Sequence, residues 1–369
     1  MIPELEQQPE DELNSIRERI SPLTVDDIFN PHDASPAELT RNNLPLGPSA
    51  GLPPELEGFW NSMFTGAGLF RHGRNQEDFE LVQTGPNNSQ ATGRLQFGSR
   101  REWSLNWSGA YVKPRGGLMI TDVLGAWTVP DVRSPVGEDP AANFRSSMWI
   151  GLDGQRQYAN STLPQLGTAH HVNQPGAPGQ TVTSWIQWWP HLPLKIKDFA
   201  VAPGDRMLAW LTVLDETRVR MLLKNDTENA LAGWVMTAPT VKDAAYFPAP
   251  IQARVSGATA EWVLERPSVG DPPVFSQLAN FSGTTFGAVA GVERTPAVFT
   301  ECWYGMATEP GAPIVVRDTR CARSIGMYQL TGNPRRKVRL SAGSCVDRSP
   351  ATGSLPECHE VHSKFVRDD

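Results

Sequence analysis

Two glutamates on one predicted strand are the first residues whose spacing suggests chemistry. In the run from Thr259 to Glu265, alternate side chains of a β-strand point to the same face, so Glu261 and Glu265 face one side and Trp262 the other. Paired carboxylates on one face can do general acid and general base work. A sheet face that is simply exposed to water is the plainer interpretation of either glutamate taken alone.

A second predicted strand presents an amide between two indoles. In the run from Ser184 to Trp189, the side chains of Trp185, Gln187 and Trp189 share one face, and the intervening residues face the other way. A polar group framed by two large aromatic rings is typical of a cleft wall, which favours a binding site on this face of the sheet.

The two glutamates also invite a carbohydrate interpretation, that of a glycan-hydrolysing enzyme or a lectin. Four strand residues span about 13 Å, whereas retaining glycosidases hold their carboxyl groups about 5.5 Å apart. The residue between the two glutamates on that face is Val263, which is not an acid. A glycan-binding sandwich therefore stays open only as an alternative.

Other patterns of chemical interest are weaker. His170 and His171 are adjacent, and neighbouring strand residues point to opposite faces, so they cannot share a metal; we interpret them as surface or loop histidines. The tail run Cys358 to His362 has neither a Cys-x-x-Cys nor a His-Glu-x-x-His spacing, and no metal site is predicted. The Gly-x-Ser-x-Gly run at Gly47 to Gly51 lies in a proline-rich stretch without the strand-to-helix turn that a nucleophilic serine requires.

The elements that position these residues are predicted to be short antiparallel strands. From about Trp103, apolar runs rich in Val, Ile, Trp and Thr are interrupted every ten residues or so by Gly, Pro, Asn and Asp. This texture predicts an all-β fold, a β-sandwich, with few helices. The candidate strands are Leu118–Val129, Ser147–Leu152, Thr181–Trp189, Arg206–Leu214, Arg218–Lys224, Ala258–Glu265 and Ile325–Leu330.

Composition and charge limit the partners. The net charge of −7 comes without a basic block, which excludes nucleic acid and anionic membranes as partners, and no stretch is long enough to span a bilayer. No secretory signal is visible at the N-terminus, so the compartment stays open. The four cysteines, Cys302, Cys321, Cys345 and Cys358, could form up to two disulfides or stay reduced.

Three segments are predicted. Residues 1–98 are rich in Pro and Asn, with a short charged helical pattern near Glu10 to Ile20, and we interpret them as an irregular leader that builds no second core. Residues 99–343 form the sandwich. Residues 344–369 form a short polar tail that is expected to fray.

Six motifs in this order and spacing resemble the eqolisins, the glutamic peptidases. They are Asn106–Ala110, Ala126–Pro130, Met148–Gly154, Leu163–Gly167, Trp185–Pro190 and Thr259–Glu265. The resemblance covers residues 99–343 and implies a concanavalin A-like sandwich of two antiparallel sheets, with a polypeptide substrate lying across the concave face. It implies an endopeptidase active at acid pH, without metal or cofactor, and we expect a monomer.

The resemblance also assigns roles. The glutamine and glutamate that form the family's catalytic pair match Gln165 and Glu265, and Trp149, Asp153 and Trp185 match residues that line or brace its cleft. A carboxylate can take a proton from water during attack on the scissile carbonyl and return it to the departing nitrogen. The glutamine amide can hold that water and donate a hydrogen bond to the developing oxyanion.

The sequence departs from the family pattern at two acids. Gln187 stands where fungal members have a glutamate, and Ala169 stands where they have an aspartate. If those acids tune the catalytic glutamate, the pH optimum shifts, and a catalytically inactive, peptide-binding relative is a second alternative. Residues 1–98 take the place of the family's propeptide, so we expect them to be dispensable for folding and to dampen activity.

Overall fold

The computed structural model describes the chain from residue 4 to residue 367 with gaps. The described residues are 4–23, 25–26, 29–66, 74–81, 101–104, 106–134, 139, 141–155, 162–174, 177–241, 249–269, 274–279, 297–318, 322–328, 336–342 and 361–367. None of the helices among these residues is long and apolar enough to cross a membrane.

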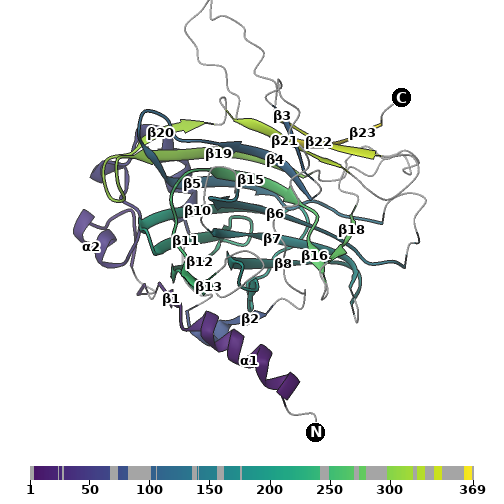
Figure 1. Ribbon diagram of the computed structural model, residues 1–369. Coiled ribbons are helices and arrows are strands. Elements are labelled where there is room, and N and C mark those ends of the chain that lie inside the picture. The colour runs from purple at the N-terminus through teal and green to yellow at the C-terminus, as the bar shows by residue number, and fades with distance from the viewer. Residues whose placement is uncertain are drawn as a thin grey trace, which may run out of the picture.

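Two antiparallel sheets stack as a sandwich, as predicted (Figure 1). The first sheet runs, in spatial order, β1 (Ile20–Pro22), β12 (Ala230–Thr237), β11 (Arg218–Asn225), β10 (Arg206–Asp215), β5 (Met119–Thr128), β19 (Val298–Ala307) and β20 (Val315–Asp318). The second runs β2 (Phe79–Leu81), β9 (Leu194–Ile196), β8 (Ala177–Trp189), β7 (Leu163–Gln174), β6 (Phe144–Leu152), β15 (Ala260–Glu265), β4 (Trp107–Val112) and β21 (Arg323–Tyr328).

Smaller elements extend these sheets. β3 (Arg101–Ser104) runs parallel to β21, β18 (Gln277–Leu278) runs parallel to β6, and β22 (Arg336–Ala342) with β23 (Val361–Arg367) connects β21 to β19. Two further pairs are β13 (Thr240–Val241) with β14 (Ile251–Gln252), and β16 (Ser268–Val269) with β17 (Val274–Phe275). The helices are α1 (Glu4–Arg17), α2 (Pro36–Arg41) and α3 (Glu57–Phe64), and the 3-10 turns are Pro48–Ala50, Pro54–Leu56 and Gln76–Asp78.

The predicted strands are all present with boundaries shifted by a few residues, because apolar alternation locates a strand better than it locates its ends. The predicted faces are also confirmed. Ile186, Trp188, Trp262 and Leu264 belong to the apolar core between the sheets. Indole N–H groups link the layers, since Trp262 donates to the backbone oxygen of Leu124 at 2.8 Å.

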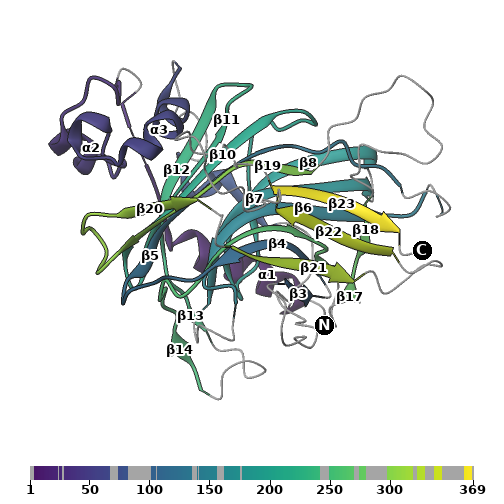
Figure 2. The ribbon, with the colours of Figure 1, turned by 90° about the horizontal axis from the view of Figure 1, so that it is seen from above.

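The leader has more structure than the sequence predicted. Its residues form α1, α2, α3 and the edge strands β1 and β2, and Figure 2 shows α3 beside β11 and β12, with α2 farther from the sheet. The expectation that this segment buries little is wrong for its described part. Nine apolar leader side chains are buried against the outer face of the first sheet: Leu23, Val25, Leu39, Leu44, Leu56, Phe59, Trp60, Met63 and Phe64.

This packing covers an apolar sheet face that would otherwise meet water. The sheet residues beneath the leader include Leu124, Leu208, Trp210 and Leu222. Burial of one large apolar side chain contributes about 1.5–3 kcal/mol, so the leader contact is comparable with the about 5–15 kcal/mol that stabilises a whole domain. The described leader is therefore an integral part of the folded core. Its resemblance to a propeptide stays a prediction.

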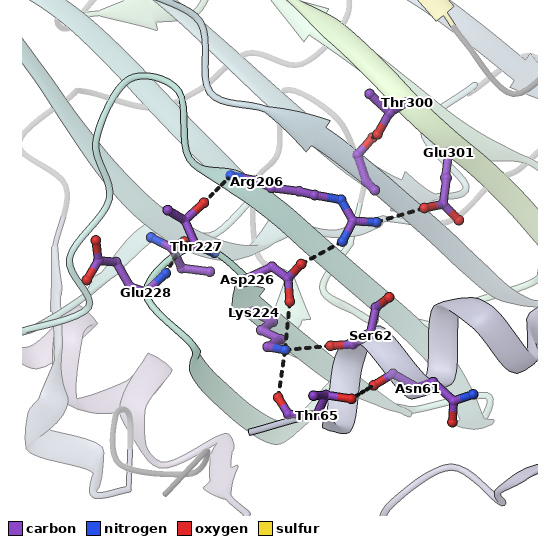
Figure 3. Close-up of polar contacts among 12 residues, drawn as sticks. Asn61, Ser62, Thr65, Arg206, Lys224, Asp226, Thr227, Glu228, Thr300 and Glu301 are labelled. Carbon is purple, nitrogen blue, oxygen red and sulfur yellow. Dashed lines mark hydrogen bonds and ion pairs between the residues drawn. The ribbon is translucent and has the colours of Figure 1, made fainter. Parts of the chain in front are cut away.

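A buried ammonium group fixes the end of α3 to the sheet (Figure 3). The side chain of Lys224 on β11 is 1% exposed, and its Nζ donates to the backbone oxygens of Ser62 and Thr65 and to Asp226 Oδ1 at 2.8 Å. Arg206 on β10 then bridges Asp226 and Glu301 at 2.6 and 2.9 Å. A cation at a helix C-terminus donates hydrogen bonds to the free carbonyl groups and interacts favourably with the helix dipole. The ion pairs from Lys224 through Asp226 and Arg206 to Glu301 therefore join the leader to β11, β10 and β19.

A chain that begins at Gly98 is expected to be much less stable than the full chain, contrary to the sequence-based expectation, because it exposes the apolar face under α3 and leaves Lys224 without its carbonyl partners. Urea unfolding of both chains measures the difference. Lys224→Met in the full chain should lower the unfolding midpoint too, since it leaves two helix carbonyls unsatisfied. An equally cooperative and equally stable truncated chain would show that the leader contact is dispensable.

Candidate active site

The candidate residues lie on the face of the second sheet that is turned away from the first sheet, here called the site face. It carries the odd-numbered side chains of β4, β6, β7, β8 and β15, because alternation sends the even-numbered ones into the core. Its apolar part comprises Trp107, Tyr111, Trp149, Leu163, Trp185, Trp189, Val263 and Ile325. The site face therefore places amides and carboxyl groups among indoles.

Strand register arranges these side chains in rows. Glu261, Gly151, Gln165 and Gln187 are Cα partners across β15, β6, β7 and β8. Four residues along β15, a second row holds Glu265, Ser147, Ala169 and Thr183. The two rows are about 13 Å apart along the strands.

Glu265 is a buried carboxyl held by two donors. Its side chain is 3% exposed, Trp149 Nε1 donates to Oε2 at 2.8 Å, and Asn106 Nδ2 donates to Oε1 at 3.2 Å. Ser104 in turn donates to Asn106 Oδ1 at 3.1 Å, which fixes the amide orientation. Burial raises the pKa of Glu265 to about 7, and the hydrogen bonds offset only part of that shift.

Gln165 is oriented by Gln187. Gln165 Nε2 donates to Gln187 Oε1 at 2.6 Å, and Gln187 Nε2 donates to the backbone oxygen of His191 at 2.6 Å. Gln165 Oε1 is buried and has no hydrogen-bond partner, and one N–H of its Nε2 is not used by the bond to Gln187. The amide therefore has one acceptor and one donor available for water or substrate.

Trp149 connects the two rows. Its Nε1 bonds Glu265, and its six-membered ring reaches Gly151, the Cα partner of Gln165, because Cζ3 lies 3.1 Å from the place of a Cβ on Gly151. Gly167 makes room for this, since a Cβ there would lie 2.6 Å from Trp149 Cβ. Trp107 packs against the Trp149 ring edge to face at 4.9 Å. The rings wall the space between Glu265 and Gln165 with apolar surface.

Glu261 is a second buried carboxyl, in the same row as Gln165. It is fully buried, and neither oxygen has a partner at hydrogen-bond geometry, although the Thr259 hydroxyl lies close enough to offset part of its pKa shift. Burial raises the pKa of Glu261 to about 8, and the charge of Asp153 adds to the shift. Gly154 faces it closely, since a Cβ there would lie 3.2 Å from the carboxyl carbon.

Asp153 and Trp185 brace the site. The Asp153 carboxylate accepts from the backbone N–H groups of residues 256–259 and from the Ser256 hydroxyl, so it fixes the loop that leads into β15. Trp185 Nε1 donates to Ser147 Oγ at 3.0 Å, and Ser147 Oγ donates to the backbone oxygen of Thr168 at 2.9 Å. These contacts hold β6, β7, β8 and β15 in register beneath the two carboxyl groups.

The adjacent histidines are buried strand residues, not the surface or loop residues that the sequence suggested. His170 lies between the sheets beside Ser146 Oγ at 3.1 Å and Thr168 Oγ1 at 2.9 Å, and His171 is on the site face opposite Arg145. Burial lowers their pKa values to about 3 and about 4. No group of three or more metal-ligating side chains occurs among the described residues. Cys302 is a buried free thiol, and Cys321, Cys345 and Cys358 lie outside the described residues.

Comparison with known proteins identifies the family. The model of the peptidase A4 family matches residues 105–299, which is more than half of the chain. The chain belongs to the peptidase A4 family. This is the eqolisin or glutamic peptidase family whose motifs the sequence resembles. No curated protein sequence matches the chain.

Solved structures of the peptidase A4 family resemble the chain at low identity. A scytalido-glutamic peptidase with a peptide-based transition state analog is 16% identical, covers 71% of this chain and 98% of its own, and has a TM-score of 0.43. SCP-B, an eqolisin in complex with the tripeptide Ala-Ile-His, is 16% identical, covers 71% of this chain and 98% of its own, and has a TM-score of 0.40. Aspergilloglutamic peptidase from Aspergillus niger is 14% identical, covers 60% of this chain and 99% of its own, and has a TM-score of 0.34.

The structure places all the predicted site residues on or beside the site face, but it separates Gln165 and Glu265 by one row spacing and puts Glu261 in line with Gln165. Sequence reasoning gave no site role to Asn106, Trp107 or the backbone of His191. Asn106 and Trp107 lie in the motif Asn106–Ala110, but only the pairing of β4 with β15 brings them next to Glu265, and the sequence did not predict that pairing. No sequence pattern predicts that the backbone oxygen of His191, just after β8, accepts a hydrogen bond from Gln187.

The raised carboxyl pKa values predict a pH-dependent stability. A buried glutamate whose pKa in the folded protein lies above the ordinary 4.5 makes the protein less stable as pH rises through that raised value. A buried histidine whose pKa lies below the ordinary 6.5 makes the protein less stable as pH falls below 6.5. The two effects oppose each other between about pH 4.5 and 6.5. Among these four buried groups, only the two glutamates still change charge above pH 6.5, so stability should decline from pH 6.5 to pH 8.

Urea unfolding midpoints at pH 6.5 and pH 8 measure this decline. Glu261→Gln should remove most of it because an amide does not ionise, whereas Glu55→Gln, at an exposed position, should leave it unchanged. An equal decline in the wild type and in Glu261→Gln would mean that Glu261 is not buried as a protonated acid.

Proposed function

We propose that the protein is an endopeptidase that hydrolyses peptide bonds with Gln165 and Glu265. The observation that carries the proposal is the presence, on one face of a peptidase A4 sandwich, of a desolvated carboxyl held by Trp149 and, one row away, of an amide that has free hydrogen-bonding capacity. The peptide-based ligand and the tripeptide in the related structures support polypeptide substrates. The mechanism involves no cofactor, and the protein acts as a monomer.

In the proposed reaction, Glu265 takes a proton from water while that water attacks the scissile carbonyl carbon. Gln165 Oε1 accepts a hydrogen bond from the water, and the unused N–H of Nε2 donates to the carbonyl oxygen as it becomes negative. Glu265 then returns the proton to the departing nitrogen, and the C–N bond breaks. The indoles of Trp149 and Trp185 exclude bulk water from the reacting groups.

The burial of the site implies that the described form is latent. Gln165, Gln187, Glu261 and Glu265 are each at most 3% exposed, so a peptide needs an opening of the site face to reach them. The same opening admits water, which removes the main cause of the raised pKa of Glu265. Opening therefore ionises the base, lets both side chains turn toward one scissile bond, and permits activity at acid pH.

Replacement of the proposed base tests the assignment. Glu265→Gln removes the proton acceptor and keeps the shape, so turnover should fall by about a hundredfold to ten-thousandfold. Gln165→Ala should cost about a hundredfold to a thousandfold and leave a residue of activity, because it removes only positioning and oxyanion stabilisation. Glu261→Gln is the matched control on the same strand and should cost far less.

The register of β15 makes the opposite outcome informative. A dead Glu261→Gln with a nearly normal Glu265→Gln would assign the base to Glu261, which lies in the row of Gln165. Digestion of protein by all three variants would refute the Gln and Glu mechanism. Urea unfolding of each variant separates loss of catalysis from loss of folding.

Inhibitor sensitivity separates this mechanism from other acid-active ones. Casein digestion followed from pH 2 to pH 8 should be unaffected by a chelator, because the proposed mechanism needs no metal, and by pepstatin, because the sequence lacks the Asp-Thr-Gly and Asp-Ser-Gly signatures of pepsin-like enzymes. Complete loss of turnover with the chelator would contradict the mechanism.

A non-catalytic peptide-binding role is the second candidate, favoured by one observation. Ala169 lies in the row of Glu265, two strands away with Ser147 between them, so an acid at this position would act through space to raise the pKa of Glu265. This candidate predicts saturable peptide binding without turnover across the same pH series. If the wild type is inert, Ala169→Asp combined with Gln187→Glu tests whether the missing acids are the cause.

A further inference from the structure

A cavity of about 500 Å³ lies on the opposite side of the molecule from the site face, between the leader and the outer face of the first sheet. Its walls come from the leader loop with Leu44 and Leu46, from Trp210 and Leu214 on β10, and from Ile314 just before β20. Small-molecule sites in proteins are typically about 300–1,000 Å³ and mainly apolar with a few polar groups. The size and lining of this cavity suit a small ligand.

Among the described residues that line the cavity, one carries a positive charge. Arg220 on β11 is 7% exposed, its Nη2 donates to Thr212 Oγ1 at 2.8 Å, and its Nη1 donates to the backbone oxygen of Asn43 at 3.3 Å. Its Nε has no hydrogen-bond partner, and no carboxylate of the described residues forms an ion pair with it. Burial lowers the pKa of Arg220 to about 10, so it stays charged at neutral pH.

The nearest acid is already occupied by other donors. Asp122 Oδ1 accepts from Trp210 Nε1 at 3.0 Å and from Thr212 Oγ1 at 2.8 Å, and its Oδ2 accepts from Thr121 Oγ1 at 3.0 Å. It makes no direct hydrogen bond or ion pair with Arg220, although its negative charge offsets part of the fall in the Arg220 pKa. A buried charge without a direct counter-ion is costly, and a carboxylate is the geometric match for the fork of a guanidinium group.

We propose that this cavity binds a small carboxylate with an apolar tail, its carboxylate paired with Arg220 and its tail against Trp210, Leu214 and Ile314. Leu46 at the cavity supports an apolar tail, because at 40% exposed it is one of two exposed large hydrophobic side chains among the described residues. The cavity walls belong to the leader and to the sheet alike, so the ligand joins the two. This inference is independent of the peptidase chemistry.

Octanoate and octanamide are the probes, because they share a tail and differ in charge. Isothermal titration of the full chain at pH 7 should show one site for octanoate and much weaker binding of octanamide. Octanoate should also raise the melting temperature, since a ligand that binds only the folded state stabilises it. Arg220→Met should weaken octanoate binding by at least about tenfold, the value of a hydrogen bond to a charged group.

Two further variants keep the test decisive if Arg220→Met does not fold. Ile314→Trp fills the cavity from the wall that the leader does not contribute, and it should abolish octanoate binding. Asp122→Asn removes the nearby negative charge and should bind octanoate at least as well as the wild type. Equal binding of octanoate and octanamide, unchanged binding by a folded Arg220→Met or Ile314→Trp, or no octanoate binding at all would overturn the proposal.

Discussion

The hydrogen bond from Trp149 to Glu265 is the interaction on which the candidate site depends. It holds a carboxyl group in an apolar wall, where burial raises the pKa to about 7. The bond exists only if β6 and β15 keep their register, and the loop before β15 is fixed by the Asp153 carboxylate. Asp153 thus anchors the start of β15, and the pairing of β15 with β4 and β6 sets the positions of its two glutamates.

The second constraint is that both faces of the first sheet are apolar. One face packs on the second sheet, and the other needs a cover, which the leader supplies with α3 and the residues around it. Lys224 and the Arg206 bridge fix that cover by charge. The part of the leader around α2 and α3 therefore lies behind the first sheet, on the opposite side from the site face, whereas β2 extends the second sheet beside β9.

Alternation was sufficient to predict the sheet faces from sequence, because Trp185 and Gln187, or Glu261 and Glu265, differ by even numbers of residues. It could not predict which residues are opposite one another on different strands, so it gave no reason to place Glu261 beside Gln165. The packing of the leader was also hidden. Its apolar residues lie on short helices and loops without a sustained period, and a lysine such as Lys224 is rarely buried.

The contacts of Gln187 give a physical reason for a glutamine at this position, where the sequence resemblance led us to expect an acid. Gln187 is held by the His191 backbone oxygen and presents an oxygen to Gln165 Nε2, which is the contact that a glutamate at this position could also make. An amide keeps that acceptor at every pH, whereas a buried carboxyl would lose it or gain a charge as it titrated. Gln165 therefore stays oriented while the ionisation of Glu265 changes, so its orientation adds nothing to the pH response of the candidate site.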